Sequence, residues 1–312
     1  MKYLNNIYYQ LLKLYSMEEK ESSNEKLIET VNISNKVRNN IKSPTQILEK
    51  SLEEKICFCC IDYDLSISEY KLFIEIKKKV TQPYDEKNEN HELSLQTLLS
   101  KTKEIINKDK EKDSESSDLI SNVTMPTNNN NLEEDIKIWR KIGFQTGNPR
   151  TDFRAGGIFS LELMIYYANN YENEYINIIN EDYFTFALVC IRLSYLIRIF
   201  LFLLSNEEIN VNLKYQKNIV ANRKELKNFC YFLYDNNNLL FDICSISLGF
   251  IYQKFIEKKK AGNKEMNYFI IDPIVLSSIE CLKNALNNIN FNDDLISELK
   301  KCFRENFLQN LE

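Results

Sequence analysis

Histidine, glycine and proline are scarce in this chain, whose 312 residues include one histidine, six glycines and five prolines. A Ser-His or Cys-His catalytic pair would have to use His91 as its general base, so the sequence does not support a hydrolytic triad. It also has neither a GxxxxGK[ST] loop nor a GxGxxG turn after a strand, the two familiar cradles for a nucleotide's phosphates. These absences argue against a hydrolase and against an ATPase or GTPase.

The eight cysteines form neither a recognisable metal site nor a disulfide framework. Three of them lie in CFCC at 57–60, but no second cluster of Cys or His could complete a zinc site, so we expect no bound metal. The alternatives for this segment are core thiols and lipidation of an exposed cysteine. The first residues lack the apolar run of a secretory signal, so we expect a cytosolic protein with reduced thiols, soluble or peripheral to a membrane.

Excess positive charge is absent too, since the formal net charge is −5. A nucleic-acid partner is therefore not indicated. The longest apolar run, at 183–204, could span a bilayer by length but contains Arg192 and Arg198. Each arginine would cost about 2.5–3.5 kcal/mol near the bilayer centre. We expect instead a helix buried in a large domain, with both arginines reaching its rim or a partner group.

The chain divides into an N-terminal helical extension with a polar linker, residues 1–90, and a larger domain, residues 91–311. The extension begins with an apolar stripe at helical spacing over 2–15. Its second apolar region, 47–80, favours helix, although KLFIEIKKKV alternates as a strand would. Charge, serine and asparagine dominate 101–131, which predicts a disordered insertion within the domain.

Helix-start signals recur in the second half of the chain and predict an all-α fold. Asn131 and Asn180 each precede an acidic first turn, and Asp272 precedes a proline, as at many helix N-termini. Residues 293–308 have the pattern of a final amphipathic helix. No series of alternating strands with turn signals accompanies these helices.

The stretch WRKIGFQTGNPRTDFRAGG, residues 139–157, holds four of the six glycines and the single tryptophan. Gly143 is placed to end one helix in the left-handed conformation, and Thr151 or Asp152 to cap the next. Arg154 would then fall at or before that helix's first turn, where the helix dipole disfavours a cation. Its position therefore needs another explanation.

Two interpretations of Arg154 are open. In the structural one, it pairs with Asp152 or a distant carboxylate and holds the two helices together. In the functional one, it offers a planar, permanently charged fork suited to phosphate or carboxylate. Gly156 and Gly157, which lack side chains, would let another backbone or a flat partner surface approach beside it.

This stretch resembles the signature of the ELMO (engulfment and cell motility) domain family, Trp-x3-Gly-Phe-Gln followed by Asp-Pro-x-Thr-Asp-Phe-Arg-Gly. The matching residues are Trp139, Gly143, Phe144, Gln145, Pro149, Thr151, Asp152, Phe153, Arg154 and Gly156. The sequence departs from the signature at Asn148, where the family has Asp, and at Ala155, where it has Gly. HELSLQTLL at 91–99 resembles an upstream segment of the family, and the resemblance extends with one interruption to about residue 290.

Short chains built around this domain resemble the ELMOD type, whose reported activity is GTPase activation on Arf-family small GTPases. The resemblance implies an all-α ELMO fold in which Arg154 is supplied in trans to the partner's phosphoryl-transfer transition state. GTP and Mg²⁺ would belong to the partner, so this chain would need no cofactor. The residues with implied partner-binding or supporting roles are Gln145, Thr151, Asp152, Gly156 and Gly157. Those expected to fix the loop from the core are Trp139, Phe144 and Phe153.

The resemblance leaves two rivals to this function. One is a scaffold that binds a small GTPase or its regulators without accelerating hydrolysis. The other is a membrane-associated adaptor that uses the N-terminal amphipathic helix or a lipidated cysteine.

Overall fold

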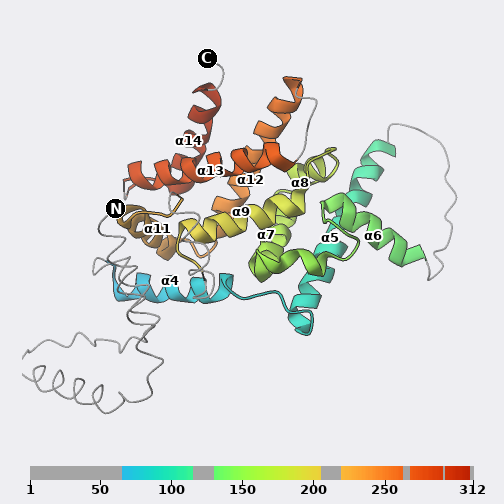
Figure 1. Ribbon diagram of the computed structural model, residues 1–312, viewed down its shortest axis with the longest axis horizontal. Coiled ribbons are helices and arrows are strands. Elements are labelled where there is room, and N and C mark those ends of the chain that lie inside the picture. The colour runs from blue at the N-terminus through green and yellow to red at the C-terminus, as the bar shows by residue number, and fades with distance from the viewer. Residues whose placement is uncertain (1–64, 115–129, 205–218, 263–267, 291, 310–312) are drawn as a thin grey trace, which may run out of the picture. The chain divides into compact units, whose positions relative to one another are not determined.

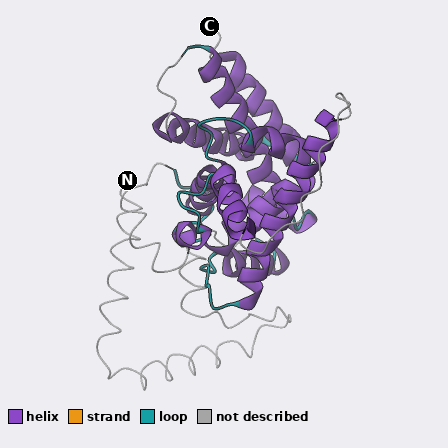
Figure 2. Ribbon diagram, turned by 90° about the vertical axis from the view of Figure 1, so that its right-hand side faces the viewer, coloured by secondary structure: helices purple, strands orange, loops and turns teal. Residues whose placement is uncertain are grey.

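The computed structural model describes residues 65–114, 130–204, 219–262, 268–290 and 292–309. Over these residues the chain forms helices and loops only (Figure 1, Figure 2), which confirms the predicted all-α class. The helices are α4 (Ile67–Val80), α5 (Glu89–Ser114), α6 (Asn130–Ile142), the 3₁₀ helix η1 (Pro149–Arg154), α7 (Gly157–Asn170), α8 (Glu172–Ile179), α9 (Phe186–Phe200), α11 (Arg223–Asp235), α12 (Leu239–Lys260), α13 (Tyr268–Asn288) and α14 (Leu295–Gln309).

All described residues belong to one compact unit, which spans Ile61–Glu312. The domain start expected at residue 91 lies inside this unit, because α4 precedes it and packs against α7 and α11. The 2–15 stripe, the polar linker and the CFCC segment lie outside the described residues, and so does the first part of 47–80.

Helix α4 confirms that KLFIEIKKKV is helical and not a strand. The Ser66 hydroxyl accepts the Glu69 backbone N–H, and the Glu69 carboxylate accepts the Ser66 backbone N–H. This reciprocal capping box satisfies two backbone donors that a helix start would otherwise leave unpaired. Phe73 on α4 is fully buried, so the alternating pattern reflects one helical face that packs on the domain.

The apolar run at 183–204 supplies α9, a buried core helix, as expected. Most of its side chains are buried, and it packs against α7, α12 and α13, with α7 and α12 beside it in Figure 1. Arg192 reaches Asp272 on α13, with Nε 2.7 Å from Oδ1. Arg198 is only 2% exposed and donates to backbone carbonyls. Both arginines therefore have partners within the fold.

Helix α12 is the described helix long and apolar enough to cross a membrane by length and composition. It packs against α7, α9, α11, α13 and α14, and 61% of its most apolar window is buried. Core packing accounts for its composition.

Two predicted helix starts are wrong, and a third is displaced by two residues. Asn180 is the C-cap of α8, and α9 begins six residues later, after Thr185. Asp272 and Pro273 lie inside α13, where Asp272 binds Arg192 instead of capping a helix. Asn131 lies within α6, which begins at Asn130. Asp272 makes a tertiary contact and Asn180 ends a helix, and local patterns do not distinguish these roles from that of an N-cap.

The insertion predicted at 101–131 is wrong over its first half, because α5 continues to Ser114. Thr102 and Ile105 are buried on one face of this helix, and the Thr102 hydroxyl lies 2.7 Å from the Tyr175 hydroxyl on α8. Residues 115–129 lie outside the described residues.

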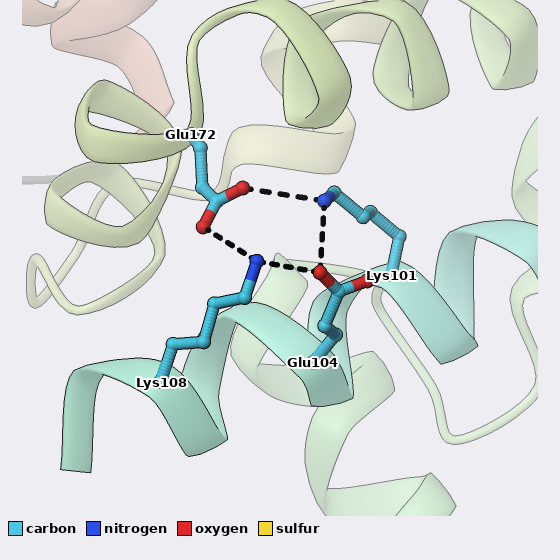
Figure 3. Close-up of polar contacts among 4 residues, drawn as sticks. All are labelled: Lys101, Glu104, Lys108 and Glu172. Carbon is cyan, nitrogen blue, oxygen red and sulfur yellow. Dashed lines mark hydrogen bonds and ion pairs between the residues drawn. The ribbon is translucent and has the colours of Figure 1, made fainter. Parts of the chain in front are cut away.

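Charged side chains on the outer face of α5 also bind neighbouring helices. Lys101 and Lys108 alternate with Glu104 and with Glu172 of α8 in a ring of ion pairs (Figure 3), the shortest being 2.6 Å between Lys108 Nζ and Glu104 Oε1. Such exposed pairs contribute little individually. These charged residues form a solvated face of α5. Their composition is the same as that of a disordered segment, so composition alone could not distinguish the two.

The Tyr175→Phe variant tests this ordering of α5. The Thr102 hydroxyl donates to the Leu98 carbonyl at 2.8 Å, so the Tyr175 hydroxyl donates to Thr102. Removing this buried donor should lower the free energy of unfolding by about 1 kcal/mol in urea denaturation. Tyr234→Phe, at a tyrosine that is 57% exposed, should change it by less than about 0.5 kcal/mol. Equal losses in the two variants would mean that Thr102 does not pack on α8.

Candidate functional site

The signature stretch begins with the end of α6, where Gly143 turns the chain as predicted. Gly143 has a φ of +101°. Its N–H donates to the Arg140 carbonyl at 3.0 Å, and the Phe144 N–H donates to the Trp139 carbonyl at 3.1 Å, which is the Schellman pattern of a helix C-terminus. A Cβ at Gly143 would lie 2.7 Å from the backbone of Thr185. Glycine is therefore required both for the turn and for close contact with the start of α9.

The loop that follows is closed by side chains within it. The Asp152 carboxylate accepts the Gln145 backbone N–H at 2.9 Å. Asn148, where the family has Asp, caps η1 by accepting the Arg150 N–H at 3.2 Å. The Thr151 hydroxyl, which has one proton to donate, lies 3.3 Å from the Asn148 carbonyl oxygen and 3.2 Å from Asp152 Oδ1. Asp152 and Thr151 thus hold the loop and do not cap α7, which begins after Gly156 without a side-chain cap.

The aromatic side chains of the stretch form a buried column behind the loop. Trp139, Phe144 and Phe153 are 5%, 4% and 1% exposed. Neighbouring ring centroids lie 5.5 Å apart for Trp139 and Phe144, 5.6 Å for Phe144 and Phe153, and 4.9 Å for Phe153 and Tyr84. Packed aromatic pairs of this kind stabilise beyond their buried area. The column attaches both ends of the loop to the α4–α5 connection.

Gly156 and Gly157 are buried and approached by this chain's own atoms. A Cβ at Gly156 would lie 2.4 Å from Ser160 Oγ. Gly157 has a φ of +59°, and a Cβ there would lie 2.5 Å from the Gln82 carbonyl oxygen. That carbonyl accepts the Ile158 N–H at 3.1 Å. The backbone that approaches Gly157 is thus that of the α4–α5 connection, whereas Gly156 is approached by the side chains of Ser160 and Ser194, so neither glycine leaves open space for a partner.

The stretch contains two arginines near η1, and the structure binds one of them firmly. Arg150 donates from Nε to Glu92 Oε1 at 2.9 Å and from Nη2 to Glu92 Oε2 at 2.5 Å. Glu92 also accepts the Tyr84 hydroxyl at 2.6 Å. The Arg150 guanidinium holds the pKa of Glu92 below its ordinary value of 4.5, and burial followed by the bond to Glu92 raises the pKa of Tyr84. The Arg150 guanidinium is therefore bound to α5 through Glu92.

Arg154 differs from Arg150 in its exposure and in its lack of bonding partners. It is exposed at the last position of η1, and its guanidinium has no ion pair or hydrogen bond with any described residue. Neither pair that the structural interpretation offered is formed among the described residues, since Asp152 accepts the Gln145 backbone N–H and no distant carboxylate binds Arg154. Among these two arginines, Arg154 alone presents a free fork to solvent on a fixed backbone.

Sequence reasoning missed three residues that complete the site: Gln82 and Tyr84 of the α4–α5 connection, and Glu92 in the first turn of α5. The resemblance at 91–99 pointed to this region but not to its contacts. His91, the single histidine, is 5% exposed here, and its Nδ1 accepts a backbone N–H at 3.0 Å. In the part of the chain that the structure describes, no group of three or more His, Cys, Asp or Glu side chains could hold a metal ion.

Replacing Gly143 by alanine should lower the free energy of unfolding by about 2 to 4 kcal/mol, because strain at positive φ adds to the backbone clash. Gly262→Ala separates the two causes, since Gly262 has a φ of +84° with nothing within 4 Å of a Cβ. That control should lose about 1 kcal/mol from strain alone. Thermal or urea unfolding measures both, and equal losses would show that contact with α9 costs nothing.

The Glu92→Gln variant should lose about 1 to 2 kcal/mol of stability near neutral pH, because Arg150 and Tyr84 lose their common carboxylate. Folding lowers the Glu92 pKa from 4.5. Its contribution is therefore complete above that pH and is lost as pH falls through the lowered folded-state pKa. The stability difference between parent and variant, measured in urea from neutral to acid pH, should shrink below about pH 4.5.

Glu134→Gln on the exposed side of α6 is the matched control for this titration. It should follow the parent at every pH. If the loss in Glu92→Gln is the same at acid and neutral pH, the carboxylate does not carry the interaction.

Comparison with known proteins places this site in a family. Residues 74–268 match the model of the ELMO/CED-12 family. The chain is 29% identical over 226 residues to ELMO domain-containing protein 2 of Homo sapiens and 30% identical over 227 residues to that of Bos taurus, covering 68% of this chain and 66% of each relative. A stretch of 44 residues is 46% identical to ELMO domain-containing protein A of Dictyostelium discoideum, covering 14% of this chain and 4% of that protein. No solved structure matches.

The chain spans just under two thirds of the length of the human and bovine relatives. The family match covers more than half of this chain and includes the α4–α5 connection, the whole signature stretch and α9. The protein belongs to the ELMO/CED-12 family.

Proposed function

We propose that this protein is a GTPase-activating protein for an Arf-family small GTPase and that it supplies Arg154 in trans. The observation that carries the proposal is the contrast between the two arginines of the signature stretch. Arg150 donates to both carboxylate oxygens of Glu92. Arg154, in contrast, is exposed and is bound by no carboxylate among the described residues. The family resemblance implies the same residue.

The chemistry suits such an arginine. Hydrolysis of GTP spreads negative charge over the transferring phosphoryl group, and a guanidinium delivered by a partner is worth about 10³ to 10⁵ in rate. That gain depends on donors held in place before the reaction. The buried aromatic column and the Asp152 bond to Gln145 keep the loop ordered while the Arg154 side chain stays outside.

Local charge also supports a nucleotide-bound partner. Residues 139–157 carry four basic side chains and one acidic side chain, although the whole chain has a formal net charge of −5. One of these four, Arg150, is neutralised by Glu92, and the positive charge that remains raises the rate of encounter with an anionic surface. GTP and Mg²⁺ would be held by the GTPase, so this chain would act without its own cofactor, in the cytosol or at the periphery of a membrane.

Ala155 favours the alternative function of a scaffold. It is exposed beside Arg154, where the family has glycine, and its methyl group enlarges the surface next to the guanidinium. A GTPase could then bind without receiving the arginine.

GTP hydrolysis by a panel of Arf-family GTPases tests the proposal. Arg154→Lys should lower the stimulated rate constant by about 100-fold or more, because lysine lacks the planar fork. Thermal unfolding should be unchanged, since Arg154 is exposed and unpaired among the described residues. Arg304→Lys, at an exposed arginine on α14, should keep the parent's activity.

The assay separates the two functions. If Arg154→Lys stimulates as well as the parent, the arginine is not catalytic. If the parent binds GTP-loaded GTPases without accelerating hydrolysis, the protein is a scaffold.

A further inference from the structure

Arg198 is a buried arginine that the proposed chemistry does not use. It lies near the end of α9 and is only 2% exposed. Its Nη1 donates to the Ala155 carbonyl at 3.1 Å, and its Nε donates to the Leu203 carbonyl at 3.3 Å. Burying a guanidinium is costly unless its donors are bound. The side chain therefore serves to join two backbone segments that lie far apart in the sequence.

One of these segments is the turn after α9. The Leu203 N–H donates back to the Arg198 carbonyl at 2.8 Å. Phe202, between them, has a φ of +56°, a conformation that bulky residues rarely adopt. Arg198 thus contacts Leu203 through both its backbone and its side chain, which fixes the position of the guanidinium.

The other segment is the peptide that directly follows Arg154. Gly156, which follows Ala155, packs against Ser194 of α9. A Cβ placed on Gly156 would lie 3.2 Å from Ser194 Oγ. Ile158 is bound to the Gln82 carbonyl. On the other side, Phe153 is buried in the aromatic column. The backbone on both sides of Arg154 is therefore fixed, and Arg198 provides the one side-chain hydrogen bond to its neighbour Ala155 among the described residues.

We propose that Arg198 is a positioning residue for Arg154, which holds the Ala155 carbonyl so that the neighbouring guanidinium reaches the partner's phosphates at a fixed distance. The inference rests on the proposed function. It places the residue that sets the geometry on α9, 44 positions away from the arginine that it serves. Catalytic geometry is demanding, because a misplacement of about 1 Å can cost about 100-fold in rate.

The Arg198→Met variant tests the inference, because methionine fills much of the same space but has no donor. Arg192→Met is the matched control, since Arg192 is also on α9 but binds Asp272 on α13. Trypsin cleavage of the full chain after Arg154, followed by mass spectrometry, measures local opening of the held peptide. Cleavage after Arg223 at the start of α11 measures opening elsewhere.

We expect cleavage after Arg154, relative to cleavage after Arg223, to rise about 10-fold or more in Arg198→Met and to stay within twofold in Arg192→Met. With a stimulated GTPase, kcat should fall about 10- to 100-fold while KM stays within about twofold. Combining Arg198→Met with Arg154→Lys should cause no further loss, because Arg198 acts through Arg154.

Two results would overturn the inference. The first is unchanged relative cleavage after Arg154 in Arg198→Met, which would show that Arg198 does not hold this peptide whatever the hydrolysis assay gives. The second is an additive loss of kcat in the double variant, which would show a general structural role. Failure of the proposed function looks different: the parent protein itself would stimulate no GTPase, while the protease measurement would still decide whether Arg198 holds the peptide.

Discussion

The geometry of the signature stretch depends on contact with one buried helix, α9, at both ends of the loop. The start of α9 lies against Gly143, so closely that no side chain fits between them, and Arg198 near its end binds the Ala155 carbonyl. Phe186 and Arg198 are separated by about 18 Å along the helix axis at 1.5 Å per residue. Because α9 is surrounded by α7, α12 and α13, this rigid spacing fixes where the loop begins and where it ends.

The arginines around the loop fall into two groups: those that are bound within the fold and one that a partner could bind. Arg150, Arg192 and Arg198 are all bound inside the fold. Arg154 is left in water, so a partner that contacts it displaces solvent without first breaking an ion pair among the described residues. Arginine suits this use because its guanidinium is more weakly hydrated than an ammonium group.

Sequence patterns predicted what depends on local chemistry. Gly143 was predictable as a helix end because few residues tolerate its φ, and the all-α class followed from repeated helix signals. The contacts that hold the loop were not predictable, since Arg150 and Glu92 are 58 residues apart and nothing local pairs them. Asn180 has the chemistry of a cap at either end of a helix, and only packing decides which. The charged half of α5 was mistaken for an insertion because its composition does not reveal the buried face at Thr102.

The α4–α5 connection belongs to the domain, although the signature residues alone do not indicate this. Its Gln82 carbonyl binds the first turn of α7, and Tyr84 stacks on Phe153. A fragment that began at residue 91 would retain every position of the motif but would lack the residues of the connection that pack against it. The smallest unit able to present Arg154 is therefore defined by tertiary contacts and not by the motif residues alone, and it includes the α4–α5 connection.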